Sequence, residues 1–344
     1  MKKLLLMAAV LCLGSVCLTS CGDEDEEQGN LKPIVIDDSE GNHVQVRKAG
    51  PYTITYDAYD QFDGFMANGN SFHVDEKGNL KFSYNDFLTD EDGEFFTNQF
   101  TMNINDRGLV SMIDFKLQVV YDEDEEIGAD QLEHRIVGKI VYGYDKNRQV
   151  TGMSTKINWE EITKLSGVKI CDQIDKIDIR HTTTWKNGLL TAFEAKEKTI
   201  CEKSELVNDK WEDMTWNEEL TTNGTIDYGT EKNEAKQMPA TLFNVVFCDM
   251  CIPMFAPIGM YGAGPANLPA SCTVYEQAIP RSGIPENGQD EYSFHFNMND
   301  NGTIASEWTD DEEPTEYQYT VTRAIGEEEA KHIVAGLKRL AKRK

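Results

Sequence analysis

The sequence predicts an all-β protein: an antiparallel up-and-down meander of about 12–16 strands that forms a soluble barrel or a strongly curved sheet. Three observations predict this fold class. Apolar and polar residues alternate with period two in many segments. Tight-turn patterns recur between these segments, and they return about every 40 residues. One apolar insert, residues 239–275, interrupts the meander and is expected to contain a short helix.

The N-terminus predicts export. Lys2 and Lys3 precede an apolar run at residues 4–16, which has the charge and length of a secretory signal and is too short for a comfortable membrane span. The run ends in Leu-Thr-Ser-Cys at Cys21, which resembles the lipobox of bacterial lipoproteins, where the cysteine thiolate takes a diacylglyceryl group. We therefore expect residues 1–20 to be a signal peptide and Cys21 to be lipidated.

The residues after this cysteine are strongly acidic. Residues 21–32 form a predicted tether that contains five consecutive acids: Asp23, Glu24, Asp25, Glu26 and Glu27. Blocks of like charge stay solvated. This block also resembles the export tag of Bacteroidota lipoproteins, which implies an outer-membrane protein that faces the cell exterior. Retention on the periplasmic side is the alternative.

The charge balance limits the partners that the chain can have. The sequence holds 60 acidic and 33 basic residues, for a net charge of −27. Such a surface repels nucleic acid and anionic lipid, so nucleic acid is not an expected partner. Attachment to the membrane is expected to come from the acyl chains on Cys21. Residues 33–325 are expected to form one β-hairpin repeat domain, and residues 326–344 a polar C-terminal tail.

Alternation is clearest in four segments, where aromatic or aliphatic residues take every second position: 52–56, 100–104, 292–298 and 317–321. This pattern predicts strands with one buried face and one wet face. Threonine, tyrosine, phenylalanine and valine, which are frequent here, suit a pleated and half-buried surface.

A recurring turn separates the strands: a polar tripeptide, then Gly, any residue and an aliphatic residue. It occurs at 75–80, 105–110 and 185–190, and in a shorter form at 223–226 and 301–304. Glycine permits the positive φ that tight hairpins require. Residues 145–150 follow the same pattern with Arg148 in place of Gly, so position 148 is expected to be strained unless Asn147 takes the left-handed conformation.

The segment Val141-Tyr142-Gly143-Tyr144-Asp145 resembles a tyrosine-aspartate hairpin repeat. Together with the acid-tagged lipobox and the meander, it makes residues 33–325 resemble a family of uncharacterised Bacteroidota putative lipoproteins with a porin-like β fold. The resemblance implies that fold and brings no catalytic residues. A membrane-spanning barrel is not expected, because the chain ends on a polar tail instead of a terminal strand with an aromatic residue.

The insert at residues 239–275 contains a single charged residue, Asp249. Its stretch 240–252 lacks Pro and Gly and is too short to span a bilayer. One face of a short helix could be formed by Leu242, Val245, Val246 and Cys248. We expect the insert to plug the barrel or cover a sheet face; a lid over an apolar ligand and a membrane-inserting loop are the alternatives.

The sequence has eight cysteines. Removal of the signal peptide and lipidation of Cys21 leave an odd set: Cys171, Cys201, Cys248, Cys251 and Cys272. At least one of these thiols is therefore free or pairs between chains. We expect buried thiols or a structural disulfide, and the connectivity stays open. A metal site and a redox motif at 248–251 are the alternatives.

Motifs for catalysis are lacking. The six histidines have no metal-ligand spacing, and no known nucleophile, zinc-protease or nucleotide-binding motif occurs. We therefore assign no catalytic, cofactor-binding or metal-binding residue and expect no cofactor. The acidic clusters at 90–94 and 122–126 could hold Ca²⁺ but lack the EF-hand register, so solvated hairpin tips are expected.

Four tryptophans lie on or beside predicted hairpins, where exposed rings could stack on sugars: Trp185, Trp211, Trp216 and Trp308. Core packing is the other role open to them. We expect a surface-exposed outer-membrane lipoprotein that binds a glycan, a peptide or a partner protein without catalysis. The alternatives are a carrier of a lipid-like apolar ligand under residues 239–275, and a glycan hydrolase with unrecognised carboxylates. An exposed tryptophan cluster would favour the binding protein. A lined apolar cavity would favour the carrier, and converging carboxylates would favour the hydrolase.

Overall fold

A computed structural model describes residues 36–57, 61–83, 95–124, 129–247, 253–310 and 312–322 of the chain. This part contains seventeen strands, one α-helix and one 3-10 helix. The all-β prediction is therefore confirmed, together with the short helix in the apolar insert.

The first six strands are short: β1 (Ile36–Asp37), β2 (His43–Ala49), β3 (Tyr52–Tyr56), β4 (Phe62–Ala67), β5 (Asn70–His73) and β6 (Asn79–Phe82). The next nine are longer: β7 (Phe95–Ile104), β8 (Val110–Asp124), β9 (Ala129–Tyr144), β10 (Val150–Leu165), β11 (Val168–Lys186), β12 (Leu189–Val207), β13 (Lys210–Lys232), β14 (Asn267–Ile279) and β15 (Glu286–Met298). The last two, β16 (Ile304–Thr309) and β17 (Thr315–Thr322), are short again.

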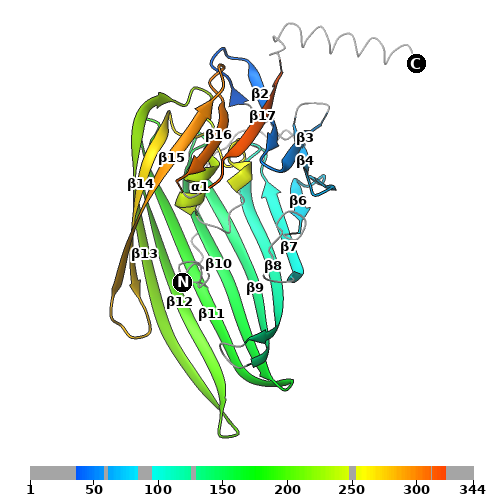
Figure 1. Cartoon of the computed structure of the whole chain (residues 1–344), viewed down its shortest axis with the longest axis vertical. Coiled ribbons are helices and arrows are strands. Elements are labelled where there is room, and N and C mark those ends of the chain that lie inside the picture. Colours follow the sequence, from blue (N-terminus) through cyan, green and yellow to red (C-terminus); the bar gives the residue numbers. More distant parts are fainter. Residues whose placement is uncertain are drawn as a thin grey trace, which may run out of the picture.

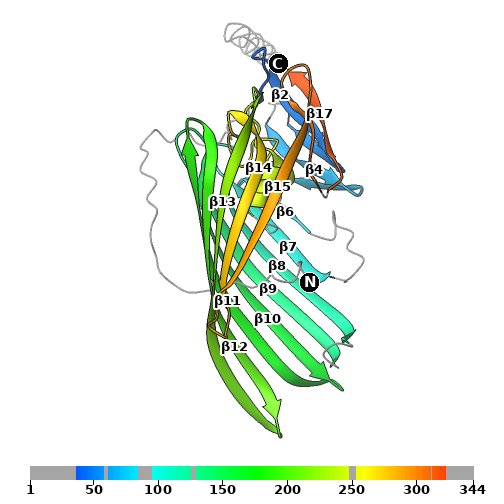
Figure 2. The same cartoon turned by 60° about the vertical axis from the view of Figure 1, so that its left-hand side comes forward.

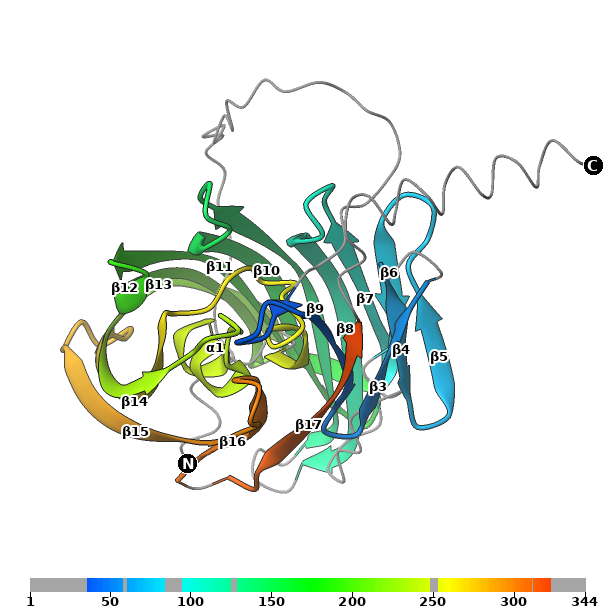
Figure 3. The same ribbon diagram turned by 90° about the horizontal axis from the view of Figure 1, so that it is seen from above.

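The strands form a nearly closed antiparallel barrel. Each strand from β2 onward is a neighbour of the next one along the chain, and β17 returns to pair with β2, with Tyr319 opposite Val46. Between β5 and β6 the pairing is an isolated bridge from Val74, which directly follows β5, to Leu80 of β6. Figure 3 shows the ring from above. The predicted up-and-down meander is confirmed, and β1 adds a short extra strand beside β2.

The barrel is much taller on one side than on the other. Strand β13 has 23 residues and β4 has 6. At a rise of about 3.3 Å per residue, these strands span roughly 75 Å and 20 Å. We call β8–β15 the tall wall; Figures 1 and 2 show it extending far past the short strands opposite. A complete ring therefore exists only at one end of the molecule.

That end carries the recurring turns at 38–42, 75–79, 105–109, 145–149 and 299–303, and we call it the turn end. In the second turn the Asp75 amide bonds the Asn79 carbonyl at 2.8 Å, and the Gly78 amide bonds the Asp75 carbonyl at 2.9 Å. The Asp75 carboxylate also accepts the Lys77 and Asn79 amides, each at 2.9 Å. The first residue of the turn thus holds the loop through its backbone and its side chain.

The turn at 145–149 has the same hydrogen bonds but no glycine. Arg148 adopts φ +65°, compared with +77° at Gly78 and +71° at Gly108. Asn147 does not take the left-handed conformation that would have relieved position 148, so the strain expected at Arg148 is present. The amide of Asn147 is held by the Asp145 carboxylate at 2.8 Å, and the amide of residue 148 bonds the Asp145 carbonyl, so the positive φ falls on Arg148.

The turn expected at 223–226 is also wrong, because these residues lie inside β13. Gly224 pairs with Phe193 of β12. A Cβ atom on Gly224 would meet the Phe193 ring at 1.9 Å, so the glycine makes room for the ring across the strand pair. Gly138 accommodates Phe115 in the same way, at 2.2 Å. Glycine inside a strand here serves close packing of an aromatic ring.

Aromatic residues tie successive hairpins together at the turn end. In each case the aromatic side chain donates a hydrogen bond to a backbone carbonyl of the preceding hairpin, at the aliphatic residue that ends the turn pattern. The three bonds are Tyr144 to Val110 at 2.6 Å, Trp185 to Val150 at 2.8 Å, and Tyr228 to Leu190 at 2.9 Å. The spacing of about 40 residues in the sequence therefore corresponds to one hairpin plus its tie to the previous hairpin.

Residues 239–247 and 253–266 of the apolar insert lie inside the ring at the turn end (Figure 3). Residues 267–275, which were expected to belong to the insert, instead form the first part of β14 in the wall. We call residues 233–247 and 253–266 the plug; it includes α1 (Ala240–Phe247) and a 3-10 turn, η2 (Pro253–Phe255). Phe243, Phe247 and Phe255 are at most 1% exposed. Within the described residues, no helix is both long enough and apolar enough to cross a membrane.

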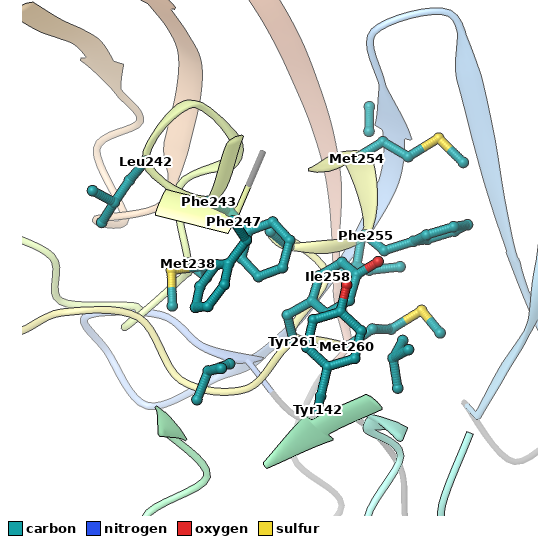
Figure 4. Close-up of a cluster of buried hydrophobic side chains, with 14 of the residues drawn as sticks. Tyr142, Met238, Leu242, Phe243, Phe247, Met254, Phe255, Ile258, Met260 and Tyr261 are labelled. Carbon is teal, nitrogen blue, oxygen red and sulfur yellow. The ribbon is translucent and has the colours of Figure 1, made fainter. Parts of the chain in front are cut away.

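The plug contacts opposite sides of the ring. The ring of Phe255 lies 6.0 Å from that of Phe62 on β4, and Phe247 lies 5.9 Å from His181 on β11. Figure 4 shows a cluster of these buried side chains, in which Phe243 and Tyr261 stack at 4.1 Å beside Tyr142 of β9. The expectation that the insert plugs the barrel is confirmed for residues 239–247 and 253–266.

A buried carboxylate fixes the plug to the wall. Glu307 of β16 is wholly buried and accepts hydrogen bonds from the Ala240 and Thr241 amides at 2.9 and 3.1 Å. The hydroxyls of Thr241 and Tyr317 also donate to it, each at 2.7 Å. Burial raises the pKa of Glu307, and these four bonds oppose that rise. The barrel therefore caps the first turn of α1 from outside the helix.

Candidate functional site

The inner face of the tall wall can be followed from strand to strand. His181 faces inward because its ring packs against Phe247 of the plug. Residues two, four and six positions earlier on β11 share that face, since side chains alternate along a strand. Across the register, Asp175 lies opposite Cys201, and Cys201 opposite Trp216. The inner face thus continues past the plug toward the far end, which carries the hairpin tips at 165–168, 207–210 and 279–286.

Five carboxylates lie on this face, one on each of five successive strands, and we call them the acidic band: Asp175 on β11, Glu197 on β12, Glu218 on β13, Glu276 on β14 and Asp290 on β15. The pairing of Thr222 with Glu276 and of Val274 with Asp290 places the last two on the same face as the others.

The band is partly buried, and this changes its protonation. Burial, and then the charges of Glu218 and Glu276, raises the pKa of Glu197 to about 8. Burial also raises the pKa of Asp175, against an opposing bond from Gln173. The pKa of Glu276 rises through burial and then through the charge of Asp290. Glu197 therefore keeps its proton at neutral pH.

Lysine and arginine do not neutralise the first four acids of the band in the part of the chain that the structure describes. The outer face of the same strands is different, because its acids have lysine partners: Asp178 with Lys156, Glu202 with Lys176, Glu219 with Lys198 and Glu194 with Lys196. On the inner face, Lys203 is bound to Glu205. Ion pairs thus lie on the outer face of these strands, whereas Asp175, Glu197, Glu218 and Glu276 on the inner face have none among the described residues.

Polar and aromatic neighbours contact the band. The indole of Trp216 donates to Glu218 at 2.9 Å. The backbone amide of Arg281 also donates to Glu218, at 3.3 Å. The guanidinium of Arg281 lies 4.6 Å above the Trp216 ring, in a cation–π arrangement. The wall therefore already holds one cation, which comes from the loop between β14 and β15.

His181 borders the band on the side of the plug. Its side chain is 8% exposed, and burial lowers its pKa to about 4, so the ring is neutral at physiological pH. Its Nδ1 atom has no hydrogen-bond partner among the described residues. Ile179 pairs with Glu197, and His181 pairs with Ala195, so His181 and Glu197 are diagonal neighbours on the inner face.

The four tryptophans selected from the sequence do not come together. Trp185 is half-buried at the turn end, where it bonds Val150. Trp211 is 48% exposed near the far end, on the outer face of β13. Trp308 stacks on His295 at 5.4 Å on the outer face of β16. Only Trp216 joins the acidic band.

Sequence reasoning missed the acidic band and its aromatic neighbour Trp159, which lies opposite Asp175 and packs against His134 at 5.2 Å. The sequence did contain one signal for Glu197: it lies two residues from both Ala195 and Thr199, so it shares the buried face of β12 with them. With 60 acidic residues in the chain, this signal could not single out one carboxylate.

The remaining candidates give no site in the described part of the chain. Cys171, Cys201 and Cys272 are free thiols there, and burial raises the pKa of Cys272 to about 12, which makes it a poor nucleophile. Among the described residues, no group of three side chains could hold a metal ion. Cys21, residues 23–27, Cys248, Cys251 and the side chains at 90–94 and 122–126 lie outside what is described.

No family model matches the sequence, and no curated protein matches it. Two solved structures are similar to it. A porin-like protein from Bacteroides vulgatus is 9% identical, with a TM-score of 0.37, over 79% of this chain and 91% of that one. A porin-like protein from Bacteroides uniformis is 11% identical, with a TM-score of 0.25, over 71% of this chain and 96% of that one. At these TM-scores, the fold and the function are inferred from the chain's own strands and side chains.

Proposed function

We propose that the protein is a non-enzymatic binding protein of the outer membrane, anchored through lipid on Cys21 and facing the cell exterior. Its ligand, a glycan, a peptide or a partner protein, lies against the inner face of the tall wall. One observation carries the proposal: beyond the plug, this face presents half-buried carboxylates and aromatic rings, and the wall rises past the short strands opposite it (Figure 2).

The surroundings of the wall support this location. Its outer face carries ion pairs, such as Lys198 with Glu219 at 2.9 Å and Lys139 with Asp114 at 3.2 Å. A lipid-facing barrel needs a continuous apolar band on that side. A water-facing barrel held by acyl chains is consistent with the charges, and the lipobox at Cys21 provides the attachment point.

The packing of the plug weighs against the carrier alternative. Phe243 and Phe247 fill the space behind residues 240–247, where an apolar ligand would have to lie. A glycan hydrolase is the second candidate, because Glu197 is protonated at neutral pH beside Glu218, as a general acid requires. A panel of aryl glycosides tests it: hydrolysis that disappears in Glu197→Gln supports an enzyme, and a panel left intact by the wild-type protein contradicts one.

A matched pair of variants tests binding at the inner face. Thr222 faces inward and Thr221 faces outward on the same strand. The wild-type protein is screened on arrays of soluble glycans and synthetic peptides. Thr222→Trp, which fills the inner face, should abolish binding of the ligand found, and Thr221→Trp should retain it. Equal binding by both variants would place the ligand elsewhere.

The anchor is tested in cells. Cys21→Ala should remove the protein from the membrane fraction, because the thiol that takes the lipid is lost. Replacement of residues 23–27 by alanine should leave the protein lipidated but protected from protease added to whole cells. Normal fractionation of the first variant, or unchanged proteolysis of the second, contradicts the corresponding part of the proposal.

A further inference from the structure

We propose that the acidic band binds the cationic side chains of an arginine-bearing peptide. The inference rests on the proposed binding function and specifies its ligand. Asp175, Glu197, Glu218 and Glu276 lie on four adjacent strands of one face, and none of them has a lysine or arginine partner among the described residues.

The contrast between the two faces of the wall is the first step. Glu218 and Glu219 are neighbours on the same strand, and among the described residues only the outward-facing Glu219 has an ion-pair partner, Lys198 at 2.9 Å. The band therefore brings several acidic groups together in a partly buried place, and a proton on Glu197 reduces their repulsion at neutral pH. Like charges at such a place raise the free energy of the folded protein, and a cation that settles among them lowers it.

One guanidinium of the chain itself, that of Arg281, already lies beside the acidic band. Arg281 reaches over the wall from the loop between β14 and β15 and lies 4.6 Å above the Trp216 ring. Trp216 in turn donates to Glu218 at 2.9 Å. An aromatic face beside a carboxylate is a favourable environment for arginine, whose planar group stacks and donates hydrogen bonds together.

His181 gives an independent sign of an unfilled polar position. Its side chain is nine-tenths buried, shares the inner face with Glu197 as a diagonal neighbour, and leaves Nδ1 without a partner in the described part of the chain. A buried polar atom normally has a hydrogen-bond partner. A neutral imidazole can accept a bond from a guanidinium N–H on the nitrogen that carries no proton.

The test uses the purified full-length protein in detergent, a penta-arginine peptide, and a penta-citrulline peptide of the same shape without charge. Isothermal titration calorimetry should show binding of the arginine peptide that weakens as salt increases, and no binding of the citrulline peptide. Equal binding of both peptides, or no binding of the arginine peptide, overturns the inference. Tighter binding of spermidine than of the peptide overturns it as well.

Two double variants with the same net charge separate the band from general attraction to an acidic protein. Glu218→Gln with Glu276→Gln removes inner charges, and Glu219→Gln with Glu194→Gln removes outer charges from β12 and β13. The inner pair should weaken binding by about tenfold or more, and the outer pair by less than about twofold. Circular dichroism confirms that both variants are folded. Equal weakening would assign the binding to net charge and overturn the inference.

Arg281→Ala adds a test in the opposite direction. Removal of the chain's own guanidinium frees the Trp216 ring, so the arginine peptide should bind more tightly, by about threefold or more. Weaker binding would overturn the inference. The outcome for the proposed function is distinguishable from this one. If Thr222→Trp abolishes binding of an array ligand but the arginine peptide does not bind, the binding function stands and the inferred ligand chemistry is wrong.

Discussion

Arg148 occupies a turn position at which glycine stands in the equivalent turns. Its φ of +65° is close to the +79° of Gly41 and the +77° of Gly78. A side chain costs about 1–2 kcal/mol in this conformation. The guanidinium of Arg148 is half-buried, and its Nε atom has no hydrogen-bond partner among the described residues. Burial, and then the charge of Arg107, lowers the pKa of this group.

We therefore expect Arg148→Gly to raise the free energy of unfolding by about 0.5–1 kcal/mol, since relief of the strain exceeds the entropy that glycine adds to the unfolded chain. Urea denaturation measures this change. Gly108→Ala is the matched control in a neighbouring turn, with φ +71°, and should lose about 1 kcal/mol. A loss of stability in Arg148→Gly would show that the turn is not strained.

Glu197 makes the stability of the protein depend on pH. Its pKa is raised from 4.5 to about 8 on folding, so the folded state holds a proton that the unfolded chain releases. Stability is therefore greatest below the unfolded pKa and falls as the pH rises through about 8. Glu197→Gln should match the wild type near pH 4 and exceed it by about 1–3 kcal/mol near pH 8. Thermal unfolding across this range measures the difference; a difference that is constant with pH contradicts the assignment.

At the scale of elements, the plug provides the clearest prediction. Phe247 of α1 is 1% exposed, so Phe247→Ala should lower the free energy of unfolding by about 3–5 kcal/mol. Phe247→Asp should prevent folding, because an unpaired charge would be buried. Asn244→Asp, on the half-buried face of the same helix, is the control and should fold. A folded and stable Phe247→Asp protein would show that α1 does not pack inside the ring.

The strands could be predicted where alternation is strict, as in Tyr292–Phe294–Phe296, and the insert could be predicted because its apolar run has no charged residue before Asp249. The length of the tall wall could not. Its inner face carries Glu197, Glu218 and Glu276, so the alternation between polar and apolar residues disappears there although the strands continue. Gly224 misled the prediction because an Asn-Gly pair suits a turn, whereas in the fold it lies under the ring of Phe193.

The candidate site was harder to predict, because it depends on which strands are neighbours. Trp185, Trp211 and Trp216 belong to two strands, yet one lies at the turn end and only one faces the acidic band. The register that aligns Asp175, Cys201 and Trp216 follows from hairpin lengths that the sequence pattern does not specify. The sequence shows which residues are acidic or aromatic, but it does not show which of them the fold brings together.

For the whole molecule, we expect protection against hydrogen exchange to decrease from the turn end to the far end. The plug and the ring form one buried cluster, whereas the hairpin tips expose Leu165, Val168 and Val207. Exchange should therefore be slowest in α1 and the strand residues around it and fastest at the tips, because local opening costs least where few apolar contacts are broken. Exchange measured by mass spectrometry of peptides tests this. Equal protection along β12 and β13 would contradict it.

The pairing of β17 with β2 has a consequence for the order in which the barrel assembles. Val46 can meet Tyr319 only when nearly the whole chain has been synthesised. Hairpins along the tall wall have local partners and can form early, whereas closing so long a loop is slow. The pairing of β2 with β17 is therefore the last to form, and until then each of these two strands presents an open edge that another chain could join. The interval before closure is the time at which this protein is most exposed to misassembly, and a chaperone that shields β2 during that interval would act at the most effective point.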